Sequence, residues 1–141
     1  GMELLQSSGK SPADEFATMA AHWTDHDFFY VHIKGTDSAG EDGDFARKVS
    51  VIEEVDRALP ALLALNPDVL MVGADHSTPA LLKAHSWHPV PFLLNARTCR
   101  PEGVAGFGER ACARGGFGRF PADQVMMAAL AHAGRLTKYG A

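Results

Sequence analysis

The most regular hydrophobic pattern of the chain lies in its first half. Apolar side chains recur at steps of three and four over residues 45–59, and this spacing predicts a long helix. Asp44 precedes the pattern and is predicted to cap the N-terminus of that helix with its carboxylate. Pro60 interrupts the pattern, so we expect a kink or a break there.

Helix-start signals predict two further helices, one toward each end of the chain. Ser11 followed by Pro12 is typical of an N-cap and a first helical residue, and this helix is predicted to run to about His22. A last helix is predicted from Pro121 to about Ala133, close to Gly134 as a stop signal. The residues predicted to face inward are Phe16, Met19 and Ala20 in the first of these helices, and Val125, Met126, Ala129 and Leu130 in the last.

Three short apolar runs predict three strands, over residues 28–33, 69–73 and 90–94. The first run is apolar except for His32, as expected of a strand that is covered on both faces. A short helix over residues 79–84 is predicted between the second and third strands. The order of helices and strands therefore predicts an α/β fold, a layered sheet with helices on both faces.

The segments between these elements are rich in glycine. Residues 34–43 carry three glycines and three acidic side chains, and residues 97–119 carry six glycines, so both segments are predicted to be loops. An apolar content of 46% over 141 residues can supply a core, and we expect residues 1–141 to form one domain.

The charge and composition of the chain mainly exclude classes of function. The 13 basic and 17 acidic side chains give a net charge of -4 without a basic stretch, which argues against nucleic-acid binding. No apolar run approaches the roughly 20 residues that span a bilayer, and no secretion signal is visible. Cys99 and Cys112 fit no zinc or redox motif and are interpreted as free thiols. These features predict a cytoplasmic protein without membrane or nucleic-acid partners.

Metal-ligating side chains stand next to all three predicted strands. Asp37 and Glu41 follow the first strand, and Asp75 and His76 follow the second. Parallel neighbouring strands would bring both groups to the same rim, since ligands in open α/β sheets gather beyond the carboxyl ends of strands. His85 precedes the third strand and reaches that rim most easily if this strand runs antiparallel to the others.

Mixed oxygen and nitrogen ligands suit zinc, manganese or iron and suit calcium poorly. Two such ions about 4 Å apart can clamp a phosphate and its attacking oxygen. Each group taken alone also has a simpler interpretation: a capped turn for Asp75 and His76, a solvated turn for the acidic segment, and a surface position for His85. Their joint spacing favours a metal-dependent phosphate enzyme, or a part of one.

Other polar residues are less informative. Lys34, Arg114 and Arg119 are candidate phosphate contacts, with simple surface solvation as the alternative. No residue of the chain is predicted to be catalytic. The histidines that show no partner pattern, and that are interpreted as structural or solvent-facing, are His22, His26, His32 and His132.

Several blocks of the chain resemble one family. From about Phe28 onward the sequence is similar to the cofactor-independent phosphoglycerate mutases of the archaeal type, within the alkaline phosphatase superfamily. It resembles only the C-terminal part of these enzymes, which implies a partial alkaline-phosphatase-like domain. The matching stretches are residues 29–37, 43–45, 51–56, 74–79, 85–92, 113–119, 133–135 and 138–141.

The resemblance implies a site for two divalent metal ions, with manganese or zinc as the expected metals. Family residues at the positions of Asp37, of the residue four further on and of His85 hold one ion. The pair at the positions of Asp75 and His76 helps to hold the other. A lysine at the position of Lys34 approaches the substrate.

Two departures from the family bear on activity. The family has histidine where this chain has Glu41; a carboxylate can still bind a metal, but it changes the charge of the site and its metal preference. The chain also contains nothing that resembles the family's metal-binding aspartate strand, nucleophilic serine or substrate-binding insert. Because phosphoryl transfer through an enzyme ester needs an activated hydroxyl, we expect the isolated chain to be inactive.

The resemblance therefore implies the metal-binding segment of a 2,3-bisphosphoglycerate-independent phosphoglycerate mutase, which acts on a phosphorylated small molecule. Two alternatives stay open. One is a metal-dependent phosphatase or phosphonate-processing enzyme that another chain completes, and the other is a non-enzymatic remnant that self-associates. Because missing strands would leave apolar surface uncovered, we expect a homo-oligomer.

Overall fold

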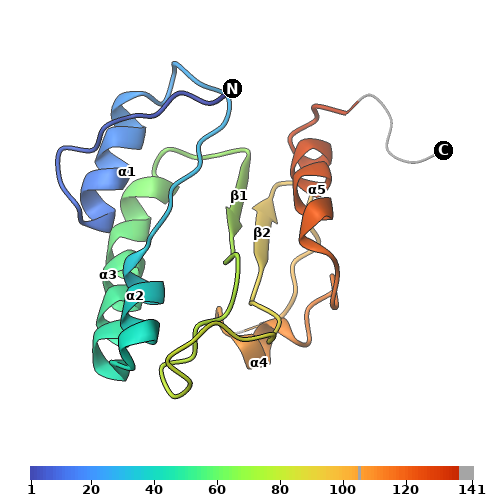
Figure 1. Ribbon diagram of the computed structural model, residues 1–141. Helices are drawn as coiled ribbons and strands as arrows, with labels where there is room; N and C mark the ends of the chain where they lie inside the picture. The colour runs from blue at the N-terminus through green and yellow to red at the C-terminus, as the bar shows by residue number, and fades with distance from the viewer. Residues whose placement is uncertain (105, 137–141) are drawn as a thin grey trace. The chain divides into compact units, whose positions relative to one another are not determined.

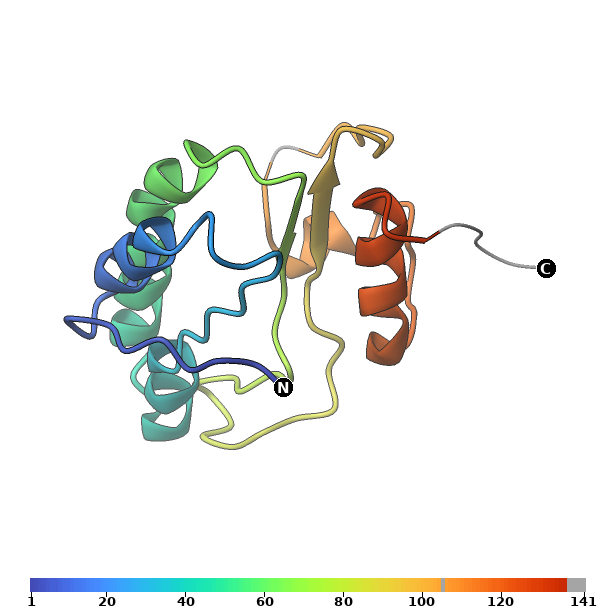
Figure 2. The same ribbon diagram turned by 90° about the horizontal axis from the view of Figure 1, so that it is seen from above.

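The computed structural model describes residues 1–104 and 106–136, and the chain divides into two compact units (Figures 1 and 2). Unit 1 consists of Gly1–Asn66 and Thr78–Ser86, and unit 2 of Pro67–Ser77 and the chain from Trp87 on. The last stretch of the family resemblance, residues 138–141, lies outside the described residues.

Unit 1 contains three helices, α1 (Pro12–Ala21), α2 (Gly35–Asp42) and α3 (Phe45–Leu63), and α3 contacts both of the others. The predicted caps of α1 and α3 are confirmed. The Ser11 hydroxyl accepts a hydrogen bond from the Asp14 N–H, and the Asp14 carboxylate accepts from the Ser11 N–H. The Asp44 carboxylate accepts from the Arg47 N–H at 2.9 Å.

Three expectations for unit 1 were wrong in detail. The segment of residues 34–43 was predicted to be a loop, but Gly35–Asp42 within it form helix α2, because packing against α3 outweighs the poor helix propensity of the glycines. Residues 28–33 form no strand. Residues 79–84 form a hydrogen-bonded turn, with the N–H groups of Leu82 and Lys83 donating to the Pro79 carbonyl, instead of a helix.

The predicted inward residues of α1 and the predicted break of α3 at Pro60 are only partly confirmed. Phe16 and Met19 of α1 are buried as predicted, whereas Ala20 is exposed. Helix α3 continues through Pro60 for three more residues, so the proline does not end it.

Unit 2 contains the sheet, in which β1 (Val69–Val72) pairs antiparallel with β2 (Leu93–Ala96). Val69 lies opposite Ala96, and Val72 lies opposite Leu93. The second predicted strand is confirmed, and the third is shifted by three residues at its start. β2 runs antiparallel to β1, which is the orientation predicted from the position of His85 before this strand.

The rest of unit 2 is a long loop with short helices, α4 (Glu109–Cys112), the 3₁₀ helix η1 (Ala122–Gln124) and α5 (Val125–His132). The predicted last helix is confirmed as η1 followed by α5, and Gly134 adopts the left-handed conformation just beyond it. Of its predicted inward residues, Ala129 is buried and Met126 is 42% exposed. Three aromatic rings, Phe92, Phe117 and Phe120, pack together with centroids 5.0–5.8 Å apart.

The predicted α/β class is thus confirmed, with five helices and a two-stranded sheet in the described part of the chain. Its core is small: the buried apolar side chains there are Phe16, Met19, Ala39, Leu62, Ala80 and Ala129. Many large apolar side chains are instead exposed, including Phe45 at 72% and Ile52 at 52% on the predicted apolar repeat of α3. Exposed apolar surface on this scale is typical of an association surface. Among the described helices, none is both long and apolar enough to cross a membrane.

Candidate metal centre

Helix α2 carries the acidic residues of the candidate site. Asp37 and Glu41 are four residues apart, so both side chains lie on the same face of the helix. The helix ends at Gly43, whose φ of 74° is the left-handed conformation that a C-terminal cap favours. The spacing of the two acids and the glycine stop are the sequence signals that could have predicted this helix.

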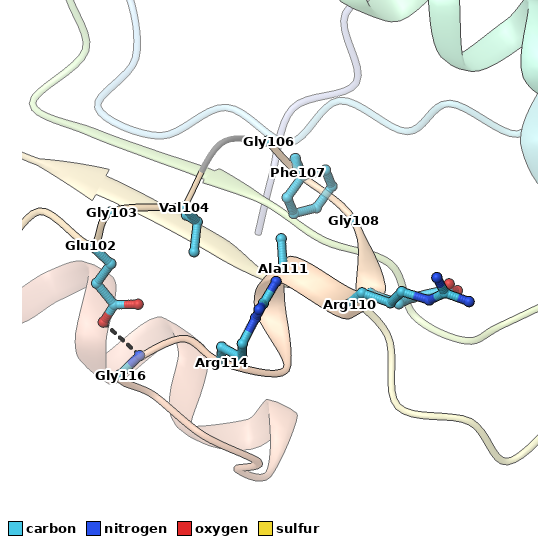
Figure 3. Close-up of a pocket in the computed structure, with 11 residues that line it drawn as sticks. Glu102, Gly103, Val104, Gly106, Phe107, Gly108, Arg110, Ala111, Arg114 and Gly116 are labelled. Atoms are coloured by element: carbon cyan, nitrogen blue, oxygen red, sulfur yellow. Dashed lines mark hydrogen bonds between the residues drawn. The ribbon is translucent and has the colours of Figure 1, made fainter.

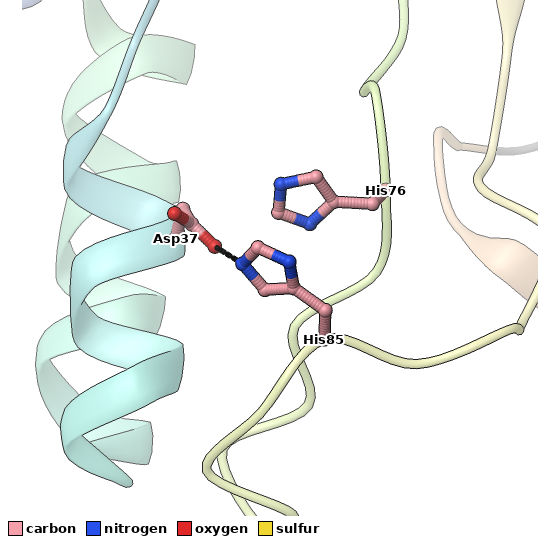
Figure 4. Close-up of side chains that lie close together, drawn as sticks. All are labelled: Asp37, His76 and His85. Atoms are coloured by element: carbon pink, nitrogen blue, oxygen red, sulfur yellow. Dashed lines mark ion pairs between the residues drawn. The ribbon is translucent and has the colours of Figure 1, made fainter.

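His85 approaches both acidic side chains from the other segment of unit 1. Its Nε2 lies 3.5 Å from Asp37 Oδ1 and 3.5 Å from Glu41 Oε1; Figure 4 shows the ion pair with Asp37. The structure therefore brings together three of the predicted ligands, which are separated by up to 48 positions, on one side of a single helix.

The spacing of these atoms suits a transition-metal site. With metal–ligand bonds of about 2.1 Å, tetrahedral geometry separates ligand atoms by about 3.4 Å. The two measured separations of 3.5 Å are close to that value. One nitrogen and two carboxylate oxygens are also a donor set that zinc and manganese accept.

Asp37 is the most enclosed of these ligands, with its side chain only 14% exposed. Its Oδ1 accepts a hydrogen bond from the Thr78 hydroxyl at 2.5 Å, and its Oδ2 forms an ion pair with the Lys34 ammonium. The Lys34 side chain is 61% exposed. Asp37 thus has a fixed orientation, while the lysine predicted to approach the substrate lies directly beside it.

Thr78 is held in place by the same helices. Its backbone carbonyl accepts a hydrogen bond from the Lys48 ammonium of α3 at 2.5 Å, and Thr78 is only 4% exposed. Gly40 of α2 lies against that carbonyl, where a Cβ atom would collide with the oxygen. The close approach of α2 therefore requires glycine at this position.

Sequence reasoning missed Thr78 and Lys48 as supports of Asp37. The spacing of residues 37, 48 and 78 in the sequence does not indicate that they are in contact. Only the tertiary packing of α2, α3 and the turn at 78–83 brings them together.

Asp75 and His76 belong to unit 2 and follow β1, as predicted. The Asp75 carboxylate accepts a hydrogen bond from the His76 N–H at 3.0 Å, and its other oxygen lies 3.5 Å from His76 Nε2. Asp75 is 75% exposed at its side chain and His76 is 28% exposed. The second carboxylate oxygen of Asp75 therefore lies near the imidazole of the adjacent His76.

Unit 2 also pairs a histidine that sequence reasoning left without a partner. His132 Nδ1 lies 2.6 Å from Thr98 Oγ1 and 3.9 Å from Cys99 Sγ. This contact joins the end of α5 to the turn after β2, and no sequence spacing indicated it.

A separate hollow lies in the loop region of unit 2 (Figure 3). Arg114, a candidate phosphate contact, lines it together with Arg110, and Glu102 accepts a hydrogen bond from the Gly116 N–H at its edge. Arg119 and the predicted metal ligands are not among its lining residues. Two glutamates on the wall, Glu102 and Glu109, balance the two arginines, so the hollow is not strongly basic.

Comparison with known proteins identifies the superfamily of the chain. A family model described as the Metalloenzyme superfamily matches residues 7–132. The chain belongs to the Metalloenzyme superfamily. This superfamily is alkaline-phosphatase-like, which confirms the superfamily expected from the sequence.

Named relatives of this Metalloenzyme superfamily chain agree with the resemblance drawn from its sequence. Proteins named probable 2,3-bisphosphoglycerate-independent phosphoglycerate mutase are 56% identical in Thermotoga neapolitana and 54% identical in Thermotoga maritima, over all 141 residues. The same name belongs to a Thermus thermophilus protein that is 50% identical. The chain spans 35% of the length of each of these relatives.

A solved structure of a Pyrococcus horikoshii protein shares the fold of this Metalloenzyme superfamily chain. The match has a TM-score of 0.90 and 28% sequence identity. It covers the whole of this chain and 45% of the Pyrococcus chain. The same fold is therefore found within a polypeptide about twice as long.

Proposed function

We propose that this chain supplies the divalent-metal site of a 2,3-bisphosphoglycerate-independent phosphoglycerate mutase, which interconverts 2-phosphoglycerate and 3-phosphoglycerate in glycolysis. The observation that carries the proposal is that His85 Nε2 lies 3.5 Å from a carboxylate oxygen of Asp37 and 3.5 Å from one of Glu41. Membership of the Metalloenzyme superfamily and relatives that bear the mutase name support it.

In this proposal Asp37, Glu41 and His85 hold one cation, and manganese or zinc is the expected metal. Asp75 and His76 hold a second cation, as in the two-metal sites that clamp a transferring phosphoryl group.

Lys34 is proposed to contact the phosphorylated substrate. Its ammonium already lies beside Asp37 on an exposed side chain, so it can turn toward a substrate anion when a cation neutralises that carboxylate. Residues 1–141 act in this proposal as one domain of a larger catalytic assembly in the cytoplasm.

The isolated chain is proposed to lack mutase activity, since its 141 residues contain no segment that resembles the nucleophilic serine region of the family. Exposed apolar side chains such as Phe45 and Ile52 favour association, so copies of the isolated chain are proposed to form a homo-oligomer.

Two preparations test this function. The purified chain is analysed for bound metal and assayed for conversion of 3-phosphoglycerate with manganese; we expect bound metal and no conversion. A chimera in which this chain replaces the 141 matching residues of the Thermotoga maritima relative is assayed beside the unmodified relative. We expect the chimera to be active and its Asp37→Asn variant to be inactive.

Each outcome has a clear meaning. Conversion by the isolated chain would refute its inactivity alone. A folded chimera that binds metal but converts no substrate, beside an active relative, would favour a different phosphatase or phosphonate activity. Absence of bound metal from both proteins would leave the self-associating remnant as the better explanation.

A further inference from the structure

Two histidines and two carboxylates lie together near the C-terminal end of α1. His22 is the C-cap of this helix, and its Nδ1 lies 3.1 Å from Asp25 Oδ2. His26 Nε2 lies 3.7 Å from an oxygen of Glu3, which belongs to the N-terminal segment. The centroids of the two imidazole rings lie 6.5 Å apart. We call these four residues, which all belong to unit 1, the α1-end cluster.

A turn and an aromatic contact hold the histidines of this cluster close to each other. The Asp25 N–H donates to the His22 carbonyl at 3.0 Å, so the chain reverses over residues 22–25 and the Asp25 carboxylate comes to lie beside the His22 ring. The His26 ring packs edge-on against Phe29, with centroids 5.7 Å apart. The backbone and the packing therefore bring two imidazoles and a carboxylate together within five residues of sequence.

The separations in the α1-end cluster are close to those of a zinc site. On a tetrahedral zinc ion with bonds of about 2.1 Å, neighbouring ligand atoms lie about 3.4 Å apart and two imidazole centroids about 5–6 Å apart. The two nitrogen–oxygen distances of 3.1 and 3.7 Å lie on either side of the first value. The centroid distance of 6.5 Å exceeds the second by about 1 Å. Each of the four side chains is at least 29% exposed, so a rotation of the rings can close this difference.

The charges of the cluster also suit zinc. Two neutral imidazoles and two carboxylates together carry a charge of -2, which one zinc ion balances. Nitrogen and carboxylate oxygen are both ligands that zinc accepts. Because zinc binds neutral imidazole, the ion replaces the proton that each histidine otherwise shares with its carboxylate. Two proton-mediated ion pairs without a metal are the competing explanation of the same contacts.

We propose that Glu3, His22, Asp25 and His26 bind a zinc ion at a site that uses none of the ligands on α2. Three of the ligands surround the turn after α1, and Glu3 reaches them from the N-terminal segment. A zinc ion bound there fastens the N-terminal segment to the end of α1. The role of this site is structural, because its four ligands already complete a tetrahedral zinc shell and leave no position for a substrate.

Nuclear magnetic resonance of the imidazole nitrogens tests the site during a zinc titration of the isolated chain. We expect the ring signals of His22 and His26 to shift together with a single dissociation constant below about 100 μM. The ring of His32, an exposed histidine of the same unit, is the internal control and should not follow that constant. The titration is repeated with the Asp37→Asn chain, in which we expect the same shifts.

Substitutions in the cluster supply the second readout. Asp25→Asn keeps the size of the side chain but removes a charged ligand, and we expect it to weaken the zinc affinity read from His26 by about 10-fold or more. His22→Ala should weaken it by at least as much, and Glu3→Gln by about 3-fold, because Glu3 is the most exposed ligand. The matched control His32→Ala should change the affinity by less than about 2-fold.

Two results would overturn the proposal. One is the absence of a shift of the His22 and His26 ring signals at zinc concentrations up to about 1 mM, which would leave only the two ion pairs. The other is a shift of either ring whose dissociation constant is unchanged by Asp25→Asn and by loss of the other histidine. The ring signals are read in the Asp37→Asn chain as well, so failure of the metal centre on α2 or of mutase activity leaves this test intact.

Discussion

Residues 28–33 and residues 69–72 are two apolar segments of similar length with different outcomes. Both were predicted to be strands, and the first has the stronger strand composition because of its aromatic and β-branched side chains. Only residues 69–72 form a strand, β1, which pairs with Leu93–Ala96. The difference lies in the partner: unit 2 contains a second apolar run that pairs with the first, and unit 1 contains no strand.

Strand formation therefore depends on two segments that pair, and not on the composition of one segment alone. An apolar run predicts a strand, but a ladder forms only when a second run pairs with it. The two segments also lead into the two groups of candidate ligands. Residues 28–33 lead to Asp37 and Glu41 on α2, and β1 leads to Asp75 and His76.

Proline substitutions in each of the two segments of the isolated chain test whether only residues 69–72 depend on ladder hydrogen bonds. Because ladder hydrogen bonds alternate along an antiparallel pair, either Leu70→Pro or Met71→Pro must remove a donor of β1. We expect the worse of these two to destabilise the chain by more than about 2 kcal/mol. Tyr30→Pro, at an exposed position without a main-chain partner, should cost less than about 1 kcal/mol. Urea unfolding followed by circular dichroism measures both, and equal losses would contradict the comparison.

A second prediction concerns the support of Asp37. Thr78→Val keeps the shape of the side chain but removes the hydroxyl that donates to Asp37 Oδ1 in a buried position. We expect a loss of about 1–3 kcal/mol in the free energy of unfolding, because the carboxylate loses a short hydrogen bond. Thr36→Val is the matched control, since its hydroxyl makes only a 3.5 Å contact with the Ile33 carbonyl. Similar losses in the two variants would show that the Thr78 hydroxyl has no special role.

The sequence predicted the fold where the signal is local. The caps Ser11 and Asp44, the apolar repeat of α3 and the glycine stop after α5 are all short-range features, and each was read correctly. It failed at α2, where glycine and acidic residues favour a loop locally and contact with α3 decides otherwise.

The candidate ligands were named from the sequence, but the supports of the site were not. Residue chemistry and family likeness suffice to select Asp37 and His85. The contact of Thr78 with Asp37 depends on how closely two backbones approach at Gly40, and that is a property of tertiary packing. The shift of the third strand to Leu93–Ala96 likewise depends on the register with β1 rather than on its own composition.

A third prediction concerns Glu41, where the resembled family has a histidine. Glu41→His replaces a carboxylate oxygen with the imidazole that the family carries at this position. Imidazole suits zinc better than manganese relative to a carboxylate, so we expect the ratio of zinc affinity to manganese affinity to rise about 10-fold. Competition titrations with a fluorescent chelator measure this ratio. A ratio that does not change would place Glu41 outside the metal site.

The smallest predicted effect lies at Glu15 of α1. Burial raises the pKa of its carboxyl above the ordinary value of 4.5, and nearby His32 opposes this in part. Because the folded-state pKa is raised, the folded chain binds more protons than the unfolded chain above pH 4.5, and stability falls as pH rises through the raised pKa. Glu15→Gln should therefore stabilise the chain by up to about 0.5 kcal/mol at pH 7 and have no such advantage at pH 4. Urea titrations at the two pH values measure the difference; an equal effect at both would contradict this assignment.

The direct test of the central claim is a manganese titration of the isolated chain, followed by electron paramagnetic resonance of the free ion. Asp37→Asn is compared with Asp42→Asn, which alters an exposed carboxylate of the same helix that forms an ion pair with Arg47. We expect Asp37→Asn to weaken manganese binding by about 100-fold and Asp42→Asn to change it by less than about 3-fold. Equal binding by the wild-type chain and both variants, or no binding by any of them, would contradict a metal site built on Asp37.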